Sequence, residues 1–177
     1  MRALNCLWLL FLTPLFIGLI NSKDSFGVEN IARARTLYKG VVEKVSDGDT
    51  ITLLTADYER VKVRLYGLDA PENKQPYGEQ SKAALKNILE RQQVIVEEID
   101  VDHYSRVVGL VRLDGQLVNL SMVAGGYAWL YPQYCKLKDV CRALSEAEST
   151  AKKKRLGLWE TSAPMPPWDW RKAQRAR

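Results

Sequence analysis

Five short stretches with the residue pattern of β-strands, separated by turns, restrict this chain to a small β-rich fold. In the two clearest stretches, apolar and polar residues alternate, which is typical of strands with one buried face. The five stretches are residues 37–45, 51–55, 61–65, 93–99 and 106–113. Asp47-Gly48-Asp49 and Asp114-Gly115 provide turns beside them. Five short strands in one unit predict a small closed barrel.

Three further segments have helical character, so the predicted class is mainly β with α (α+β). A helix is expected after Pro76-Tyr77-Gly78, because apolar residues then recur at helical spacing up to Leu89. A short helix is expected over 117–125 and a final one over 142–156, which Gly157 would end. The proline-rich tail over 164–170 is expected to be extended, with its tryptophans packed back on the body.

The first 22 residues differ from the rest of the chain. Arg2 is the only charged residue before Lys23, and an apolar run lies between them. A short basic start followed by an apolar run is typical of a secretory signal peptide. The run is also nearly long enough to span a bilayer, so an uncleaved anchor is the alternative, although Pro14 disfavours a regular helix there. With either outcome we expect the rest of the chain to be exported, and residues 23–36 to be a linker.

Composition excludes several classes of protein. The chain has 177 residues, of which 46% are hydrophobic and 27% charged, and this is inconsistent with a disordered protein. A single histidine excludes a catalytic centre built on several histidines and a His-rich zinc site. The formal net charge of +5 permits an anionic partner without requiring one.

Cysteine usage agrees with export. If Cys6 is lost with the signal peptide, Cys135 and Cys141 remain. An even pair in an oxidising compartment predicts a disulfide, which would stiffen a short surface segment. Two free thiols are the alternative.

Acidic residues cluster in three motifs: Asp47-Gly48-Asp49-Thr50, then Asp69-Ala70-Pro71-Glu72, then Asp102-His103-Tyr104-Ser105-Arg106. The Asp-Gly of the first motif is foremost a turn signal. In the second motif, Asp69 and Glu72 would repel each other on a rigid loop unless a cation lay between them. Asp49 begins the neighbouring strand and reaches the same point. Carboxylate, carbonyl and water oxygens suit calcium or magnesium.

Two arginines accompany these acids. Arg64 projects from the non-core face of its strand, and Arg106 starts another strand. A guanidinium binds phosphate bidentately and keeps its charge at neutral pH, whereas the more common role of a strand arginine is a surface salt bridge. Together with the acids, these arginines form a constellation suited to phosphoryl transfer.

The three motifs, in this order and on these elements, resemble the staphylococcal nuclease (thermonuclease) family. The resemblance runs from about Leu37 to Trp159 and includes the last helix, which ends in Lys152-Lys-Lys-Arg-Leu-Gly-Leu-Trp159. It implies an OB-fold barrel and a calcium-dependent phosphodiesterase acting on DNA and RNA. The chain departs from the pattern at Ser105, where many members have glycine, and in the short loop after Glu72.

The resemblance also implies which acidic residues hold the metal and which one acts as a base. Asp49 and Asp69 correspond to the calcium carboxylates, and Ala70 to a residue that offers its backbone carbonyl. Asp47 lies near the metal without being a direct ligand. Glu72 corresponds to the general base that acts on the attacking water.

By the same resemblance, Arg64 and Arg106 correspond to the arginines that hold the phosphate and stabilise its developing charge. Tyr104, Trp129 and Tyr131 correspond to aromatic groups around the nucleotide. An OB surface combines a basic groove with aromatic stacking, which suits single-stranded nucleic acid.

We therefore expect a nuclease domain over 37–160, with three helices on a five-stranded OB-fold barrel, and a basic Pro/Trp-rich tail over 161–177. The expected protein is an exported, monomeric, calcium-dependent nuclease with no stable protein partner. It would be secreted or periplasmic, with a membrane link only through an uncleaved N-terminal segment. The alternatives are a non-catalytic OB module that binds nucleic acid and a metal-dependent phosphodiesterase for small nucleotides.

Overall fold

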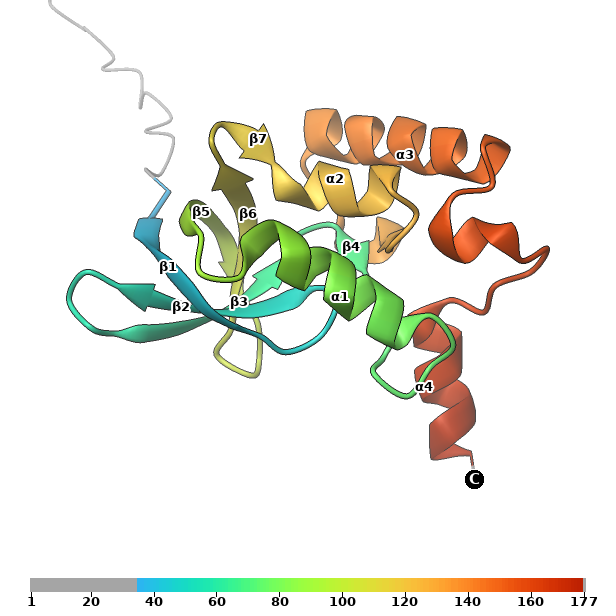
Figure 1. The fold of residues 1–177 in the computed structure, drawn as a ribbon, viewed down its shortest axis with the longest axis horizontal. Helices are drawn as coiled ribbons and strands as arrows, with labels where there is room; N and C mark the ends of the chain where they lie inside the picture. The colour runs from blue at the N-terminus through green and yellow to red at the C-terminus, as the bar shows by residue number, and fades with distance from the viewer. Residues whose placement is uncertain (1–34, 177) are drawn as a thin grey trace, which may run out of the picture. The chain divides into compact units, whose positions relative to one another are not determined.

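The computed structural model describes residues 35–176 (Figure 1). The predicted signal peptide or anchor, and the predicted linker up to residue 34, lie outside the described residues. The elements, in chain order, are β1 (Leu37–Val45), β2 (Thr50–Thr55), β3 (Arg60–Leu65), β4 (Leu68–Asp69), α1 (Gly78–Leu89), β5 (Gln93–Val101), β6 (Val107–Leu113), β7 (Gln116–Leu117), α2 (Val118–Ala124), β8 (Trp129–Leu130), the 3₁₀ turn η1 (Pro132–Tyr134), α3 (Lys138–Lys153), the 3₁₀ turn η2 (Gly157–Glu160) and α4 (Pro167–Arg175).

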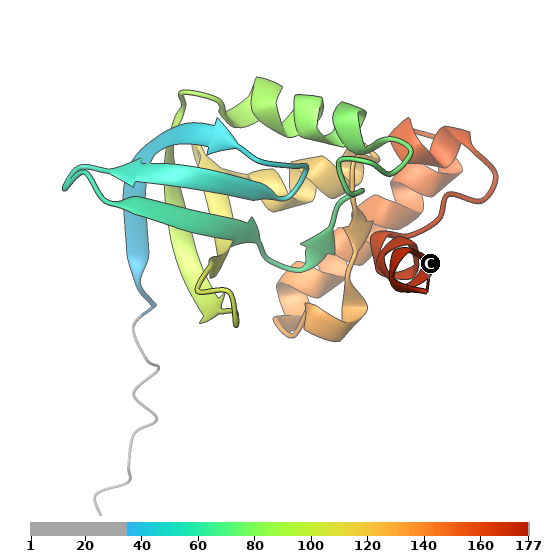
Figure 2. The same ribbon diagram turned by 90° about the horizontal axis from the view of Figure 1, so that it is seen from below.

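Five strands close into a barrel, which confirms the predicted fold. Antiparallel pairing runs in the order β3, β2, β1, β5 and β6, and β3 then pairs with β6 in parallel to complete the ring. The short β7 pairs with β6 at the edge of the sheet, and β4 pairs with β8 outside the barrel. Figure 2 shows the long strands wrapping around one another, with α1 (green) above them and the orange and red helices toward the right.

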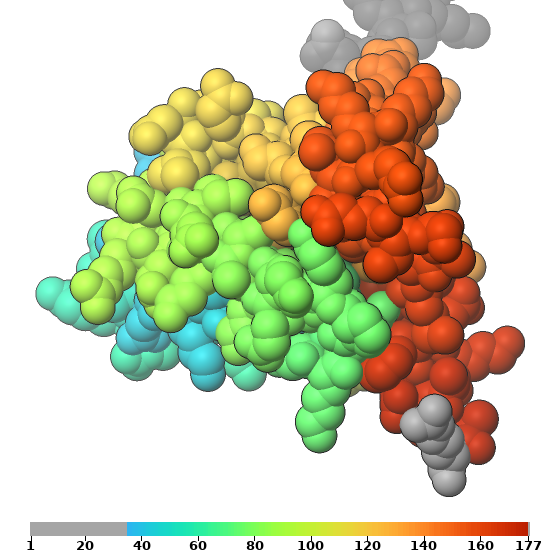
Figure 3. All heavy atoms as spheres, turned by 45° about the vertical axis from the view of Figure 1, so that its right-hand side comes forward, coloured from blue at the N-terminus to red at the C-terminus, as the bar shows by residue number. Residues whose placement is uncertain are grey.

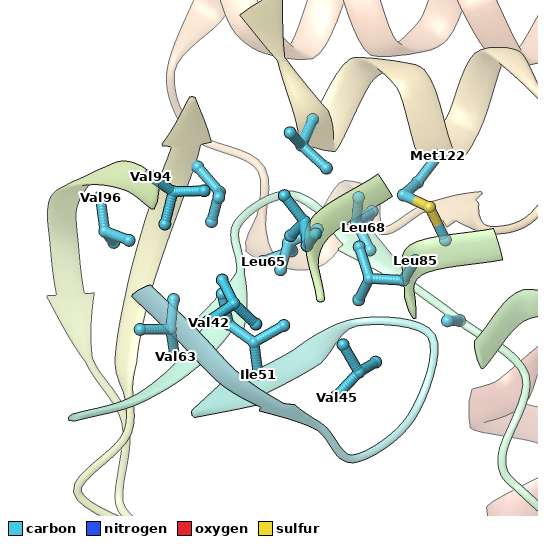
Figure 4. Close-up of a cluster of buried hydrophobic side chains, with 14 of the residues drawn as sticks. Val42, Val45, Ile51, Val63, Leu65, Leu68, Leu85, Val94, Val96 and Met122 are labelled. Atoms are coloured by element: carbon cyan, nitrogen blue, oxygen red, sulfur yellow. The ribbon is translucent and has the colours of Figure 1, made fainter. Parts of the chain in front are cut away.

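The core fills the barrel and continues under the helices (Figure 4). Alternate residues of β2 and β3, including Ile51, Leu53 and Val63, are fully buried, as the alternation predicted. Leu85 from α1 and Met122 from α2 belong to the same cluster. The core therefore fixes which face of β3 points inward. The side chains of the opposite face lie outside the core and can belong to a functional site.

Residues 35–176 form four helices where three were expected. The final predicted helix begins earlier, at Lys138, and ends at Lys153, before Gly157. The expectation of an extended tail was wrong, because residues 167–175 form α4. Pro167 suits the first turn of a helix, where its missing N–H is not needed, and Asp169 favours the same turn through the helix dipole.

Helix α4 is attached to the body by the segment that precedes it. Gln75, which is buried, donates a hydrogen bond from Nε2 to the carbonyl oxygen of Met165 at 2.7 Å. In Figure 3 the red atoms of the C-terminal segment lie against the green atoms of the region around α1. The tail therefore packs beside the loop that leads into α1.

Cys135 and Cys141 form a disulfide with a Cα–Cα distance of 5.7 Å. It links the end of η1 to the first turns of α3. Within residues 35–176, no helix has both the length and the apolar character needed to cross a membrane.

Reduction of this disulfide is expected to lower the free energy of unfolding by about 2 kcal/mol, because it closes a short loop in the unfolded chain. Urea unfolding with and without dithiothreitol measures the change. A variant with serine at both positions is the control and should not respond to reductant. Coincident unfolding curves for the wild type would contradict the prediction.

Candidate functional site

Arg64 lies between two buried aspartates at one end of the barrel. Its neighbours Val63 and Leu65 point into the core, so strand alternation turns Arg64 to the opposite face. Thr50 pairs with Arg64 in the β2–β3 register, which brings Asp49 beside it. Arg64 Nη1 donates to Asp49 Oδ1 at 3.0 Å, and Nη2 donates to Asp69 Oδ1 at 2.7 Å. The aspartates are only 3% and 1% exposed, so the arginine compensates charges that water cannot reach.

The environment of this cluster shifts several pKa values. Burial and the negative charge of Asp49 raise the pKa of Asp47 to about 7. Burial also raises the pKa of Asp69, although hydrogen bonds from Arg171 oppose the change. Burial alone would lower the pKa of Arg64, but Asp49 and Asp69 raise it above its ordinary value. Arg64 is therefore charged at every working pH.

Glu72 lies on the loop after β4, at the rim of the cluster. Its backbone N–H donates to Gln75 Oε1 at 3.1 Å, which helps to fix the loop. The Oε1 atom of Glu72 accepts a hydrogen bond from Arg171 Nη1 at 2.7 Å. With a side chain 41% exposed, Glu72 can meet water, unlike the two buried aspartates.

Arg106 is held by Asp102 in the turn before β6. Nε of Arg106 donates to Asp102 Oδ2 at 2.7 Å, and its guanidinium lies 5.3 Å from the centre of the Tyr104 ring. Burial opposes the change, but hydrogen bonds from the backbone and side chain of Arg106 lower the pKa of Asp102. Ser105 has φ of 59°, the left-handed conformation that glycine adopts most easily, which explains why many members of the resembled family have glycine there.

A cavity of about 430 Å³ brings most of the predicted residues together. Asp69 lies just behind it, in contact with Arg64 and Arg171. The predicted residues that line the cavity are Asp47, Asp49, Arg64, Ala70, Glu72, Tyr104, Arg106 and Tyr131.

Trp129 is the predicted residue that the structure does not bring to the cavity. Only 6% of it is exposed, and its ring packs edge-on against Trp159 with the ring centres 5.4 Å apart. Strand alternation would place Trp129 and Tyr131 on the same face, but β8 ends at Leu130, so Tyr131 lies outside the strand and its side chain reaches the cavity. Trp129 is a core residue in this chain.

Arg171 and Arg175 of the C-terminal tail complete the cavity wall. The sequence pattern predicted that the tail's tryptophans pack back on the body, but it did not predict that the tail reaches this cavity. Arg171 Nη2 donates to Asp69 Oδ2 at 2.7 Å, and its Nη1 also reaches Asp69 Oδ1 at 3.2 Å. Trp168 stacks on Tyr131 with ring centres 5.1 Å apart. Pro167 and Asp169 were available as signals for a helix start, but no local pattern indicated where that helix docks.

Asp49 and Asp69 keep unused carboxylate acceptor positions of the kind that calcium takes as ligands. No three His, Cys, Asp or Glu side chains form a ready metal cluster within residues 35–176, so backbone carbonyls and water would have to complete the shell. A carboxylate has about four acceptor positions. The protein uses three on Asp49, through Thr50, Arg64 and the N–H of Ala70, and three on Asp69, through Arg64 and Arg171. One position therefore stays open on each carboxylate, at Oδ2.

Comparison with known proteins agrees with this geometry. The family model described as "Staphylococcal nuclease homologue" matches residues 62–161. A protein named micrococcal nuclease from Shigella flexneri is 37% identical over 147 residues, covering 78% of this chain and 83% of its own length. Protein ParB from Escherichia coli is 36% identical over 148 residues, covering 78% and 82%. An uncharacterized endonuclease from Haemophilus influenzae is 37% identical over 134 residues, covering 76% and 73%. With this fold, this cluster and these relatives, the chain belongs to the staphylococcal nuclease homologue family.

Proposed function

We propose that the protein is a calcium-dependent nuclease that hydrolyses phosphodiester bonds of DNA and RNA, with a preference for single strands. The observation that carries the proposal is the grouping of Arg64, Arg106, Glu72 and Asp49 around one cavity, with Asp69 just behind it. A protein that only binds nucleic acid has no need for Glu72, because its charge repels phosphate. The relatives named as nucleases support the catalytic interpretation.

Each of these residues has a separate role in the proposed hydrolysis. Glu72 takes a proton from a water molecule, whose oxygen attacks phosphorus, while the ester bond to the leaving oxygen breaks. The leaving oxygen takes a proton from solvent, and Glu72 returns its proton to solvent. Arg64 and Arg106 hold the phosphate and stabilise the charge that develops on its oxygens. When bound by Asp49, Asp69 and the Ala70 carbonyl, calcium would supply charge screening and alignment.

Removal of calcium tests this proposal. The purified protein is expected to degrade single-stranded DNA and RNA with calcium, and to lose this activity in excess chelator. Gel assays of oligonucleotide length measure the result, and calcium added back in excess over the chelator is the control. Full activity in chelator would show that the metal assignment is wrong. Binding without cleavage would favour the non-catalytic OB module, and cleavage of mononucleotide esters alone would favour a small-nucleotide phosphodiesterase.

We also propose that the protein is exported, as a secreted or periplasmic enzyme. The basic and apolar start of the chain supports export through a signal peptide or anchor. The disulfide between Cys135 and Cys141 supports the same conclusion, because such bonds persist in oxidising compartments.

A further inference from the structure

One face of α4 is turned toward the active-site cavity. Trp168, Arg171 and Arg175 follow one another at three- and four-residue spacing, so they share a stripe of the helix. Trp168 stacks on Tyr131, Arg171 contacts Asp69 and Glu72, and both arginines line the cavity. The helix therefore meets the site through this stripe.

The helix forms a wall of the cavity and does not fill it. About 430 Å³ remains with α4 in place, and the lining includes residues of both the barrel and the helix. The Trp168–Tyr131 stack and the Gln75–Met165 hydrogen bond hold the wall at two points. A substrate can thus contact α4 without displacing it.

A second hollow of about 350 Å³ adjoins the cavity, between the loop after β4 and α4. Glu72, Arg171 and Arg175 belong to both hollows, and Lys74 lines the second. The two hollows therefore meet at the Glu72–Arg171 ion pair.

The cationic side chains of the two hollows differ in whether they already pair with a carboxylate. Arg64, Arg106 and Arg171 each form ion pairs with carboxylates. Arg175 and Lys74 are exposed, and neither belongs to an ion pair within residues 35–176. They are therefore the cations of these two hollows that can bind a new anion without losing a partner.

We propose that Arg175 and Lys74 form a second phosphate subsite, which binds the backbone phosphate next to the one that is cleaved. This inference rests on the proposed nuclease function and adds a substrate contact to it. The ligand class is a polynucleotide, because only a chain with a second phosphate can reach both hollows. Arg171 lies between the two sites, where its contacts with Asp69 and Glu72 make it a positioning residue.

Salt-dependent binding of a single-stranded oligonucleotide tests the subsite. The measurement uses full-length protein carrying Glu72→Gln, with calcium present, so that the oligonucleotide is bound and not cut. Adding Arg175→Ala is expected to weaken binding three- to tenfold and to reduce the slope of log Kd against log salt by about 0.7, which corresponds to one lost phosphate contact. Lys74→Ala on the opposite wall is expected to act in the same direction.

Lys172→Ala is the matched control. Lys172 is also an exposed cation of α4, but it lines neither hollow. Its removal is expected to leave the slope unchanged. If the Arg175 and Lys172 variants have equal slopes, or if Arg175→Ala weakens binding without changing the slope, the subsite is wrong.

The same experiment separates this inference from the proposed function. If the wild-type protein cuts the oligonucleotide while the Arg175 and Lys172 variants behave alike, only the subsite fails. If the wild-type protein neither binds nor cuts nucleic acid, the proposed function fails and the subsite fails with it.

Discussion

Replacing Glu72 with glutamine is expected to lower kcat by about 10²–10⁴-fold, the usual contribution of a general base. The change removes the group that takes the proton of water and retains an oxygen that can accept the hydrogen bond from Arg171. Binding of single-stranded DNA should therefore persist, because in the proposed mechanism the arginines hold the phosphate. Steady-state cleavage and equilibrium binding, measured on the same oligonucleotide with calcium, separate the two quantities.

Glu90→Gln is the control for a lost carboxylate. Glu90 pairs with Lys86 on the surface of α1 and does not line the cavity. Its replacement should leave kcat unchanged. If the Glu72 variant cuts at the wild-type rate, Glu72 is not the base. If the variant loses binding and cleavage together, Glu72 supports the loop and not the chemistry.

Much of this site could be predicted because local pattern and register determine it. Alternation in β3 places Val63 and Leu65 in the core, which leaves Arg64 on the other face. The turn at Asp47-Gly48 starts β2 at Thr50, and Thr50 pairs with Arg64. Antiparallel pairing then brings Asp49 to the guanidinium without any long-range information.

The C-terminal part of the site could not be predicted in this way. The contacts of Arg171 with Asp69 and Glu72 join residues 102 and 99 positions apart, and no periodicity reports such a contact. The repulsion between Asp69 and Glu72 did indicate a cation between them. In the structure, the guanidinium of Arg171 contacts both carboxylates. This contact forms only because α4 docks beside the cavity.

Replacing Arg64 with alanine is expected to lower the free energy of unfolding by about 3–5 kcal/mol, because buried Asp49 loses its charged partner and buried Asp69 keeps only Arg171. The same change is expected to lower kcat by about 10³–10⁵-fold, the range found for arginines that stabilise phosphoryl transfer. Urea unfolding in chelator measures the first effect, and cleavage with calcium measures the second.

Arg60→Ala is the matched control on the same strand. Arg60 pairs with Glu43 at the exposed surface, so its loss is expected to cost no more than about 1 kcal/mol and to leave kcat unchanged. If the Arg60 and Arg64 variants lose the same amount of stability, the ion pairs of Arg64 with the buried aspartates do not stabilise the fold more than a surface ion pair does.

Arg64→Lys then separates charge from geometry. Lysine keeps the positive charge near Asp49 and Asp69 but lacks the planar fork that reaches both carboxylates and a phosphate. We expect it to recover much of the stability that alanine loses while kcat stays far below the wild-type value. A lysine variant with wild-type kcat would show that Arg64 acts on the reaction as a charge alone. If lysine lowers stability as much as alanine does, the two-point hydrogen bonding of Arg64, and not its charge, compensates the buried aspartates.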